Sequence, residues 1–347
     1  MLSVPLVGGF AVIYLLAKAI MDVVGRILAS YESSLCENGT INRGNMNRLQ
    51  ANLLLTVAAM IWGSSFVVQQ IATGELGTIT FTGARFLLGG LLVLPFALHQ
   101  FAYVSANERT FSPKDWGGLL LTGCVLFIAA ALQQHGILRT TVINSGFLTA
   151  LYVPLVPVIG LIFLKRKVHF SIWPASCFCF LGTFILSGAR GVELAIGDLW
   201  VLSSTVFWAS HVILVGIMAS KTRAPLVVAC SQFLICGIVG LSVGLVVEAP
   251  SLSQVSSAAW GICYMGVFPV AIAFTLQVVG QRFTAAADAA IILSSETVFA
   301  AMGGMIFLGE RLSLLQLSGA AMILVAILLV ELLNLSGLGK ARPLEKI

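Results

Sequence analysis

Three ionisable side chains lie deep inside long apolar stretches of the sequence: Arg85, His211 and Glu296. Where such stretches cross a lipid bilayer, ionisable groups are costly unless they face other protein groups or a water-filled cavity. These three are therefore the first candidates for binding a solute or moving a proton. Asp288 and Glu331 lie nearer the ends of their stretches, where solvation at the membrane surface explains them better.

Four residues lie near the middle of their stretches, each roughly eleven residues from an end: Trp62, Tyr152, Trp208 and Glu296. We expect them to gather around a central site. There Glu296 either exchanges a proton with water or recognises a cationic amino group, with aromatic rings beside it. The competing interpretation of Glu296 is a hydrogen bond between helices, and that of the tryptophans is packing.

Further polar side chains extend this candidate site. Gln133 and Gln277 lie towards its opposite ends, and solute contact or hydrogen bonding between helices explains them equally well. Arg85 either pairs with a carboxylate or receives an anionic group of a solute, and a satisfied neutral His211 competes with a titrating one. The candidate substrate-binding residues are Trp62, Arg85, Gln133, Asn144, Tyr152, Trp208, His211, Gln277 and Glu296.

The composition indicates what must position these residues. Of 347 residues, 59% are apolar and 10% are charged, and the mean hydropathy is +1.02. A soluble domain carries about a quarter charged residues, so lipid must cover most of this surface. Each span takes roughly 20 residues, which leaves room for about ten or eleven of them. The net charge of +5 lies in short loops, which indicates the inner membrane surface and not nucleic acid.

The apolar stretches predict an all-α integral membrane fold of ten transmembrane helices. The loops place thirteen basic residues on one side and three on the other, so both ends of the ten-helix unit are predicted to be cytoplasmic. Pro154 and Pro157 should bend the helix beside Tyr152 and provide a hinge for gating, because proline removes backbone hydrogen bonds. The predicted helices lie near 51–70, 79–98, 116–134, 143–164, 170–189, 197–219, 224–247, 257–281, 285–308 and 314–337.

The two halves of the chain resemble each other. A shift of 144 residues places Trp116 on Trp260 and Gln133 on Gln277. Each half has an odd number of spans, so the halves must lie upside down to each other, as the inverted repeats of secondary transporters do. The predicted domains are an N-terminal extension (1–45), two five-helix repeats (46–190 and 191–338) and a cytoplasmic tail (339–347).

Residues 1–45 have no partner in the repeat. Val4–Ala17 is apolar but short for a span, and charged residues follow it along one helical ridge, as in an interfacial helix. A polar linker then leads to Met46, which is typical of a natural start. The segment is either an interfacial helix with a linker or the artefact of an upstream start site. We expect a chain that begins at Met46 to insert and transport normally.

Several motifs are together similar to those of one known family. Ile61–Phe66 (IWGSSF) resembles the opening helix of the EamA-type family of the drug/metabolite transporter superfamily, and Arg85–Leu88 (RFLL) resembles its second helix. Asn144–Thr149 (NSGFLT) and Leu293–Leu312 are similar to its fourth and ninth helices. Thr297 stands where many members carry a proline. This difference concerns only the local kink of the helix.

The resemblance covers about residues 46–337 and implies ten helices that transport amino acids, other metabolites or drugs, often outward. We therefore expect an exporter in the cell's inner membrane that works by alternating access, with proton coupling left open. Its partners would be a small solute, protons if coupled, and the bilayer, with a homodimer left open. The alternative is a flippase of lipid-linked or small molecules, or a facilitator, without ion coupling. A shared fold does not determine the substrate.

Other classes of protein lack support in the sequence. No G-x-x-x-x-G-K-[ST] loop of an ATP-driven pump occurs, and neither an H-E-x-x-H motif nor paired acids of an intramembrane enzyme are present. The seven cysteines include no C-x-x-C pair and no Cys/His cluster with metal spacing. We expect no enzymatic activity, no cofactor and no metal.

Overall fold

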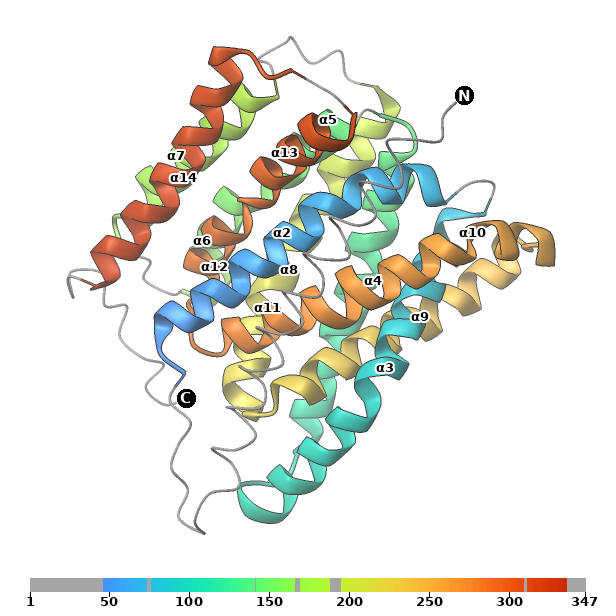
Figure 1. Cartoon of the computed structure of the whole chain (residues 1–347). Coiled ribbons are helices and arrows are strands. Elements are labelled where there is room, and N and C mark those ends of the chain that lie inside the picture. The colour runs from blue at the N-terminus through green and yellow to red at the C-terminus, as the bar shows by residue number, and fades with distance from the viewer. Residues whose placement is uncertain are drawn as a thin grey trace.

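The computed structural model describes residues 46–73, 76–140, 142–165, 169–187, 195–308 and 311–335. Every regular element of this part is helical, and helices lie at all ten predicted places (Figure 1). The predicted extension 1–45 and tail 339–347 lie outside it. The first half contains α2 (Arg48–Ala72), α3 (Thr78–Asn107), α4 (Pro113–Ile137), α5 (Val142–Ala150), α6 (Tyr152–Leu164) and α7 (Ile172–Leu186). The second contains α8 (Ile196–Thr222), α9 (Pro225–Val247), α10 (Leu252–Met265), η1 (Gly266–Phe274), α11 (Thr275–Gln281), α12 (Ala286–Leu293), α13 (Glu296–Leu308) and α14 (Leu314–Leu335).

The described helices include seven stretches that are long and apolar enough to cross a membrane. Two further apolar helices, Ile172–Leu186 and Leu314–Val330, are shorter. Large apolar side chains such as Phe163, Val246 and Leu328 point outwards, which suits a surface covered by lipid. The protein is thus a multi-pass membrane protein, while ten complete spans remain a prediction.

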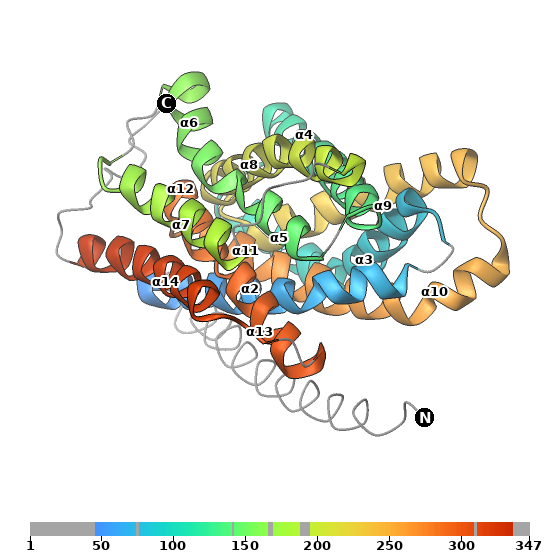
Figure 2. The same ribbon diagram turned by 90° about the horizontal axis from the view of Figure 1, so that it is seen from above.

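The contacts between the two halves repeat when one half is exchanged for the other. The pairs α3–α9 and α7–α14 each join equivalent helices of the two halves, and they lie at opposite sides of the bundle (Figure 2). The contact of α4 with α8 has its equivalent in the contact of α2 with η1 and α11. This arrangement is that of two similar halves related by a twofold axis, and it fits the predicted repeat.

Glycines permit the closest of these crossings. A Cβ atom on Gly83 of α3 would lie 2.4 Å from the backbone nitrogen of Leu241 and 2.6 Å from the carbonyl carbon of Gly240 on α9. Likewise, a Cβ on Gly182 of α7 would lie 2.7 Å from the carbonyl oxygen of Gly319 on α14. Small residues let helix backbones approach in this way inside membranes.

The fourth predicted helix is broken beside Tyr152. Its two parts, α5 and α6, meet at Leu151, whose backbone N–H donates to the carbonyl of Leu148 at 3.1 Å, as in a tight 3₁₀ turn. Pro154 has no N–H with which to bond Ala150, so the regular ladder cannot cross this point. The bend predicted beside Tyr152 is present.

The ninth predicted helix is broken at the equivalent point, before Glu296, although Thr297 replaces the proline of the family. Here hydroxyl groups bond back to the helix: Ser294 Oγ and Ser295 Oγ donate to carbonyls three residues earlier at 2.6 and 2.7 Å. Thr297 Oγ1 donates likewise at 2.8 Å. Such bonds compete with the backbone ladder and bend helices, so the break does not depend on proline.

The eighth predicted helix contains a π-helical segment, η1, which the sequence analysis did not predict. Pro269 lies inside it and removes a backbone donor, and wide turns accommodate such a defect. The carbonyl oxygen of Pro269 accepts a bond from Trp62 Nε1 at 3.2 Å. The equivalent helix α4 is regular throughout.

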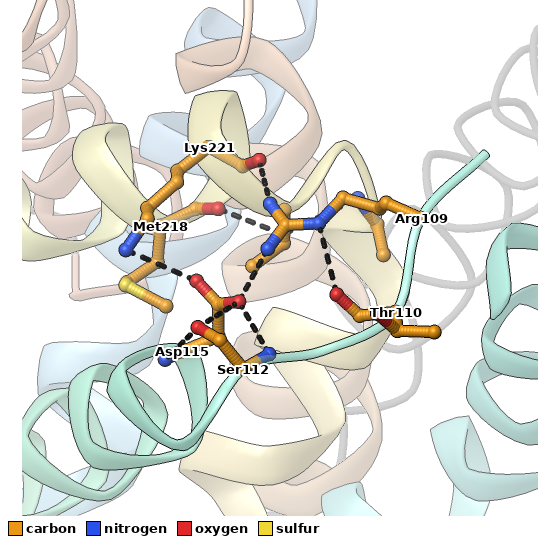
Figure 3. A network of polar contacts seen from close by, with 8 residues as sticks. Arg109, Thr110, Ser112, Asp115, Met218 and Lys221 are labelled. Atoms are coloured by element: carbon orange, nitrogen blue, oxygen red, sulfur yellow. Dashed lines mark hydrogen bonds and ion pairs between the residues drawn. The ribbon is translucent and has the colours of Figure 1, made fainter. Parts of the chain in front are cut away.

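A polar network joins the start of α4 to the end of α8 (Figure 3). The buried carboxylate of Asp115 accepts bonds from the backbone N–H and the hydroxyl of Ser112 at 2.8 and 2.7 Å. It also pairs with Arg109 and, at 3.1 Å, with Lys221 Nζ. The same arginine donates to the carbonyl oxygen of Lys221 at 2.5 Å. The network caps α4 and ties the preceding loop to α8.

Candidate functional site

A cavity lies between helices of both halves, with about 630 Å³ of empty space when the open solvent at its mouth is included. Its wall combines aromatic rings, amides, one guanidinium and one carboxyl group. Seven of the nine predicted site residues line it: Trp62, Arg85, Gln133, Tyr152, Trp208, Gln277 and Glu296. The remaining wall is formed by Ser65, Phe66, Gln69, Phe86, Thr149, Val212, Met265, Pro269, Val270, Phe274 and Leu293.

Two predicted site residues do not line the described cavity. The side chain of Asn144 lies outside the part that the structure describes. His211 is buried behind the wall, where its Nε2 lies 2.7 Å from Gln232 Oε1. Its ring packs edge-on against Trp208 and Phe274, with centroids 5.8 and 6.0 Å away. His211 thus supports the aromatic wall from outside the cavity.

Glu296 is the first residue of α13, and a glycine holds it against the middle of α2. A Cβ on Gly63 would lie 2.5 Å from the carbonyl oxygen of Glu296 and 2.8 Å from the backbone nitrogen of Ala300. Any larger residue in place of Gly63 would push α13 away. The side chain of Glu296 is buried at the cavity wall and forms no hydrogen bond or ion pair with a described residue.

Phe274, the last residue of η1, is the centre of an aromatic cluster. Its ring centroid lies 4.6 Å from that of Trp62, 5.6 Å from that of Phe86 and 6.0 Å from that of Trp208. The indole nitrogen of Trp208 is buried and has no hydrogen-bonding partner among the described residues. Aromatic faces beside a carboxyl group suit a cation.

Arg85 is held in place from α2. Its Nη1 donates to Gln69 Oε1 at 2.9 Å, and the amide nitrogen of Gln69 donates to Ser65 Oγ at 3.2 Å. The guanidinium also lies over the rings of Phe81 and Phe86, 5.6 and 5.4 Å from their centroids. Its position is therefore determined without any acidic partner.

The sequence analysis missed Ser65, Phe66 and Gln69, although a signal was present. They follow Trp62 at i+3, i+4 and i+7, which is one face of a helix. Once Trp62 was assigned to the cavity, the same face of α2 should have been assigned with it. Thr149, which accepts a bond from the amide nitrogen of Gln133 at 2.9 Å, carried no comparable signal.

Polar contacts close the end of the bundle at which α2 begins. Arg48 and Asp288 form an ion pair, and Thr284 Oγ1 donates to Asn52 Oδ1 at 2.8 Å. Gln281 Nε2 donates to a backbone carbonyl of α8 at 2.9 Å. These contacts join α2, α8, α11 and α12 beyond the cavity. The residues of α2 that line the cavity, 62 to 69, lie in the C-terminal half of this helix.

The arrangement suits binding of a small polar organic molecule. The wall provides a cation, an acid, amides and aromatic faces around one cavity. Within the described residues, no group of three or more His, Cys, Asp or Glu is placed to hold a metal ion.

Comparisons with known proteins agree with this description. The family model described as the EamA-like transporter family matches residues 49–188 and again residues 195–332. A relative from Archaeoglobus fulgidus, named only as an uncharacterized transporter, is 29% identical over 83% of this chain and 87% of its own length. The uncharacterized transporter YwfM of Bacillus subtilis is 24% identical over 81% of this chain and 93% of its own.

A solved structure has the same fold. A crystal structure whose title names no activity superimposes with a TM-score of 0.67 at 18% identity, covering 84% of this chain and 99% of the other. At this identity the likeness bears on the fold alone.

Proposed function

This chain belongs to the EamA-like transporter family and is a membrane transporter, and from that premise we propose that it exports small organic metabolites by alternating access. The proposal rests on one observation above all: a polar and aromatic cavity lies where the two halves meet. Secondary transporters with inverted repeats bind their solutes at this place. Amino acids and related metabolites suit the cavity, and the transporter would lie in the cell's inner membrane.

The contacts around the cavity support a mechanism of alternating access. The end at which α2 begins is closed by an ion pair and hydrogen bonds between the halves. An equivalent bond, from Thr140 to Asp198, lies at the other end, so each end can open by breaking its own contacts. The breaks before Tyr152 and Glu296 would let α5 and α12 move apart from α6 and α13 in that exchange.

Glu296 serves this transport in one of two ways. It exchanges a proton when the cavity opens to either side, which couples solute flux to a proton gradient, or it stays charged and recognises a cationic group. The titratable and charged groups around it are Arg85 and Tyr152 at the same cavity and Cys179, which accepts a bond from Ser294. A proton gradient should drive flux in the first case and have little effect in the second.

Flux measurements with purified protein in liposomes test the proposal. A carrier should show saturation and counterflow with a member of a metabolite panel, whereas an open channel shows neither. Movement of lipid-linked substrates without solute counterflow would favour the flippase. We expect Glu296→Gln to insert normally and lose coupled transport by about a hundredfold. Glu108→Gln, a loop residue near Arg223, should behave like the wild type.

Topology can be tested separately. We propose ten spans in two inverted repeats, 46–190 and 191–338, with both ends of this unit cytoplasmic. Single cysteines at Lys165 and Arg311, in a cysteine-free background, should then label from opposite sides of the membrane. Labelling from one side would contradict the inversion. Deletion of residues 1–45 should leave insertion and flux intact.

A further inference from the structure

Two groups that can carry opposite charges line the same cavity without pairing. Arg85 and Glu296 are 4% and 5% exposed, and both belong to the cavity wall. Neither forms an ion pair with any described residue, and they do not bond to each other. A buried charge without a partner is strongly unfavourable, because the interior does not replace the water that it loses. Two such groups of opposite sign at one cavity require an explanation.

The cationic side is built for an anionic group. Gln69 satisfies one guanidinium nitrogen of Arg85, and the rings of Phe81 and Phe86 fix its plane. The Nε atom has no partner among the described residues. That atom is itself buried, so an anionic group would approach the cavity side of the guanidinium, which can bind a carboxylate through parallel donors.

The anionic side is built for a cationic group. Glu296 has no hydrogen-bonding partner in the described part, and Tyr152, Trp62 and Trp208 share its cavity. Rings beside a carboxylate stabilise an ammonium group through their faces. Gly63 lets the backbone of Glu296 lie against α2, which fixes the point from which its side chain reaches the cavity.

We propose that the cavity selects a dipolar solute, whose anionic group binds Arg85 and whose ammonium group binds Glu296. This inference rests on the proposed function and names its substrate class. A solute of this kind compensates both buried charges at once. A simple amine or a simple carboxylate leaves one of them unpaired, which costs affinity. Arg85 lies in the first third of α3 and Glu296 begins α13, so the solute would point its anionic group towards α3 and its ammonium group towards the start of α13.

The test measures binding apart from flux, through the shift in unfolding temperature of the detergent-purified full chain. The twenty amino acids and glycine betaine serve as the panel. The best of them is then compared with its two matched analogues: for leucine, 4-methylpentanoate and 3-methylbutylamine. We expect the wild type to be stabilised by the dipolar solute and to bind either analogue at least about tenfold more weakly.

Two variants should lose the preference for the dipolar solute, each in favour of a different analogue. Arg85→Gln removes the charge that the carboxylate needs, so it should bind the amine about as well as the amino acid. Glu296→Gln should bind the carboxylate about as well as the amino acid. Glu108→Gln, which lies outside the cavity, is the matched control and should keep the wild-type order.

The outcomes separate the two proposals. Absence of stabilisation by any panel member, or equal binding of all three analogues by the wild type, would overturn the dipolar site. Variants that lose binding of every probe alike would overturn it too, because a merely structural role predicts that result. Selective binding without flux in liposomes would leave the dipolar site standing and refute export.

Discussion

The two halves of the chain build the same frame but place different polar groups on it. In the first half, Arg85 on α3 bonds an amide of α2. In the second half, the equivalent helices carry the neutral pair Gln232 and His211. Likewise, Tyr152 begins α6 where Glu296 begins α13. Each half therefore contributes one charge to the cavity, and neither half alone contributes both.

The two ends of the bundle share one polar contact. Thr284 bonds Asn52 at the end where α2 begins, and Thr140 bonds Asp198 at the end where α8 begins. These bonds are equivalent, because a shift of 144 residues places 140 on 284 and, in the first helix, a shift of 146 residues places 52 on 198. They show that the frame provides the same contact at both ends.

The ion pair between Arg48 and Asp288 breaks this equivalence. The corresponding positions at the other end hold Leu194 and Asn144, which cannot form an ion pair. A duplicated frame provides two conformations of similar free energy, and an interaction present in only one of them shifts the population. The duplicated frame thus makes two conformations possible, whereas the residues that differ between the halves shift the population and provide the binding groups.

The largest expected effect comes from disrupting the shared frame. In Gly240→Leu the new side chain would meet Gly83, whose Cα lies 2.7 Å from the position of an added Cβ, and α3 and α9 would have to separate. Overpacking of this kind costs about 3 kcal/mol or more, so we expect little monodisperse protein on size-exclusion chromatography in detergent. Gly117→Leu is the control, since nothing lies within 4 Å of its added Cβ. A normal peak for Gly240→Leu would contradict the close crossing.

A smaller effect follows from removal of the ion pair at one end only. In Arg48→Gln the partly exposed pair is lost, which we expect to weaken closure of that end by about 1 kcal/mol, or roughly fivefold in population. A cysteine placed at Val212 of the cavity, in a cysteine-free background, should then label about fivefold faster from the Arg48 side. Arg109→Gln breaks a different ion pair outside the cavity and should leave labelling unchanged.

The paired threonines should give smaller effects of opposite sign. Thr284→Val removes a hydrogen bond at the end where α2 begins, and Thr140→Val removes its equivalent at the other end. One such bond contributes about 0.7 kcal/mol, towards the low end of the usual range, so we expect shifts of about threefold in the same labelling assay. Shifts in the same direction would contradict the twofold relation of the two contacts.

The smallest effect is expected at His211. Because it lies behind the aromatic wall, His211→Gln should change solute affinity by less than about twofold and leave the pH dependence of flux unchanged. The unfolding-temperature shift and liposome flux at several pH values check this. A pH dependence that disappears in the variant would assign His211 to the transport cycle.

Much of the frame follows from sequence patterns. Apolar stretches of span length located all ten helical regions, and the repeat shift brought Tyr152 and Glu296 to equivalent helix breaks. The cavity residues Trp62 and Glu296 were predicted from depth alone. These succeed because lipid imposes helix length and depth directly on composition.

Other features depend on packing between distant helices, which one sequence does not reveal. The π-helix around Pro269 could not be distinguished from a simple kink. His211 was a candidate because it is an ionisable residue inside an apolar stretch, but the structure buries its side chain against Gln232 on another helix. The depth of a residue can be predicted from its place along a helix, whereas the direction of its side chain depends on the neighbouring helices.

The unpaired charges of the cavity also bear on the kinetics of transport. An empty cavity with two uncompensated charges must hold water while the helices rearrange, whereas a cavity filled by a dipolar solute can close without it. The solute-bound protein should therefore switch between its inward-facing and outward-facing conformations faster than the empty protein. One-way flux requires the empty protein to return, and exchange of one solute for another does not. Under the proposed dipolar site, with Glu296 charged, exchange of solutes would be favoured over one-way flux, and the outward rate would follow the supply of solute on the opposite side.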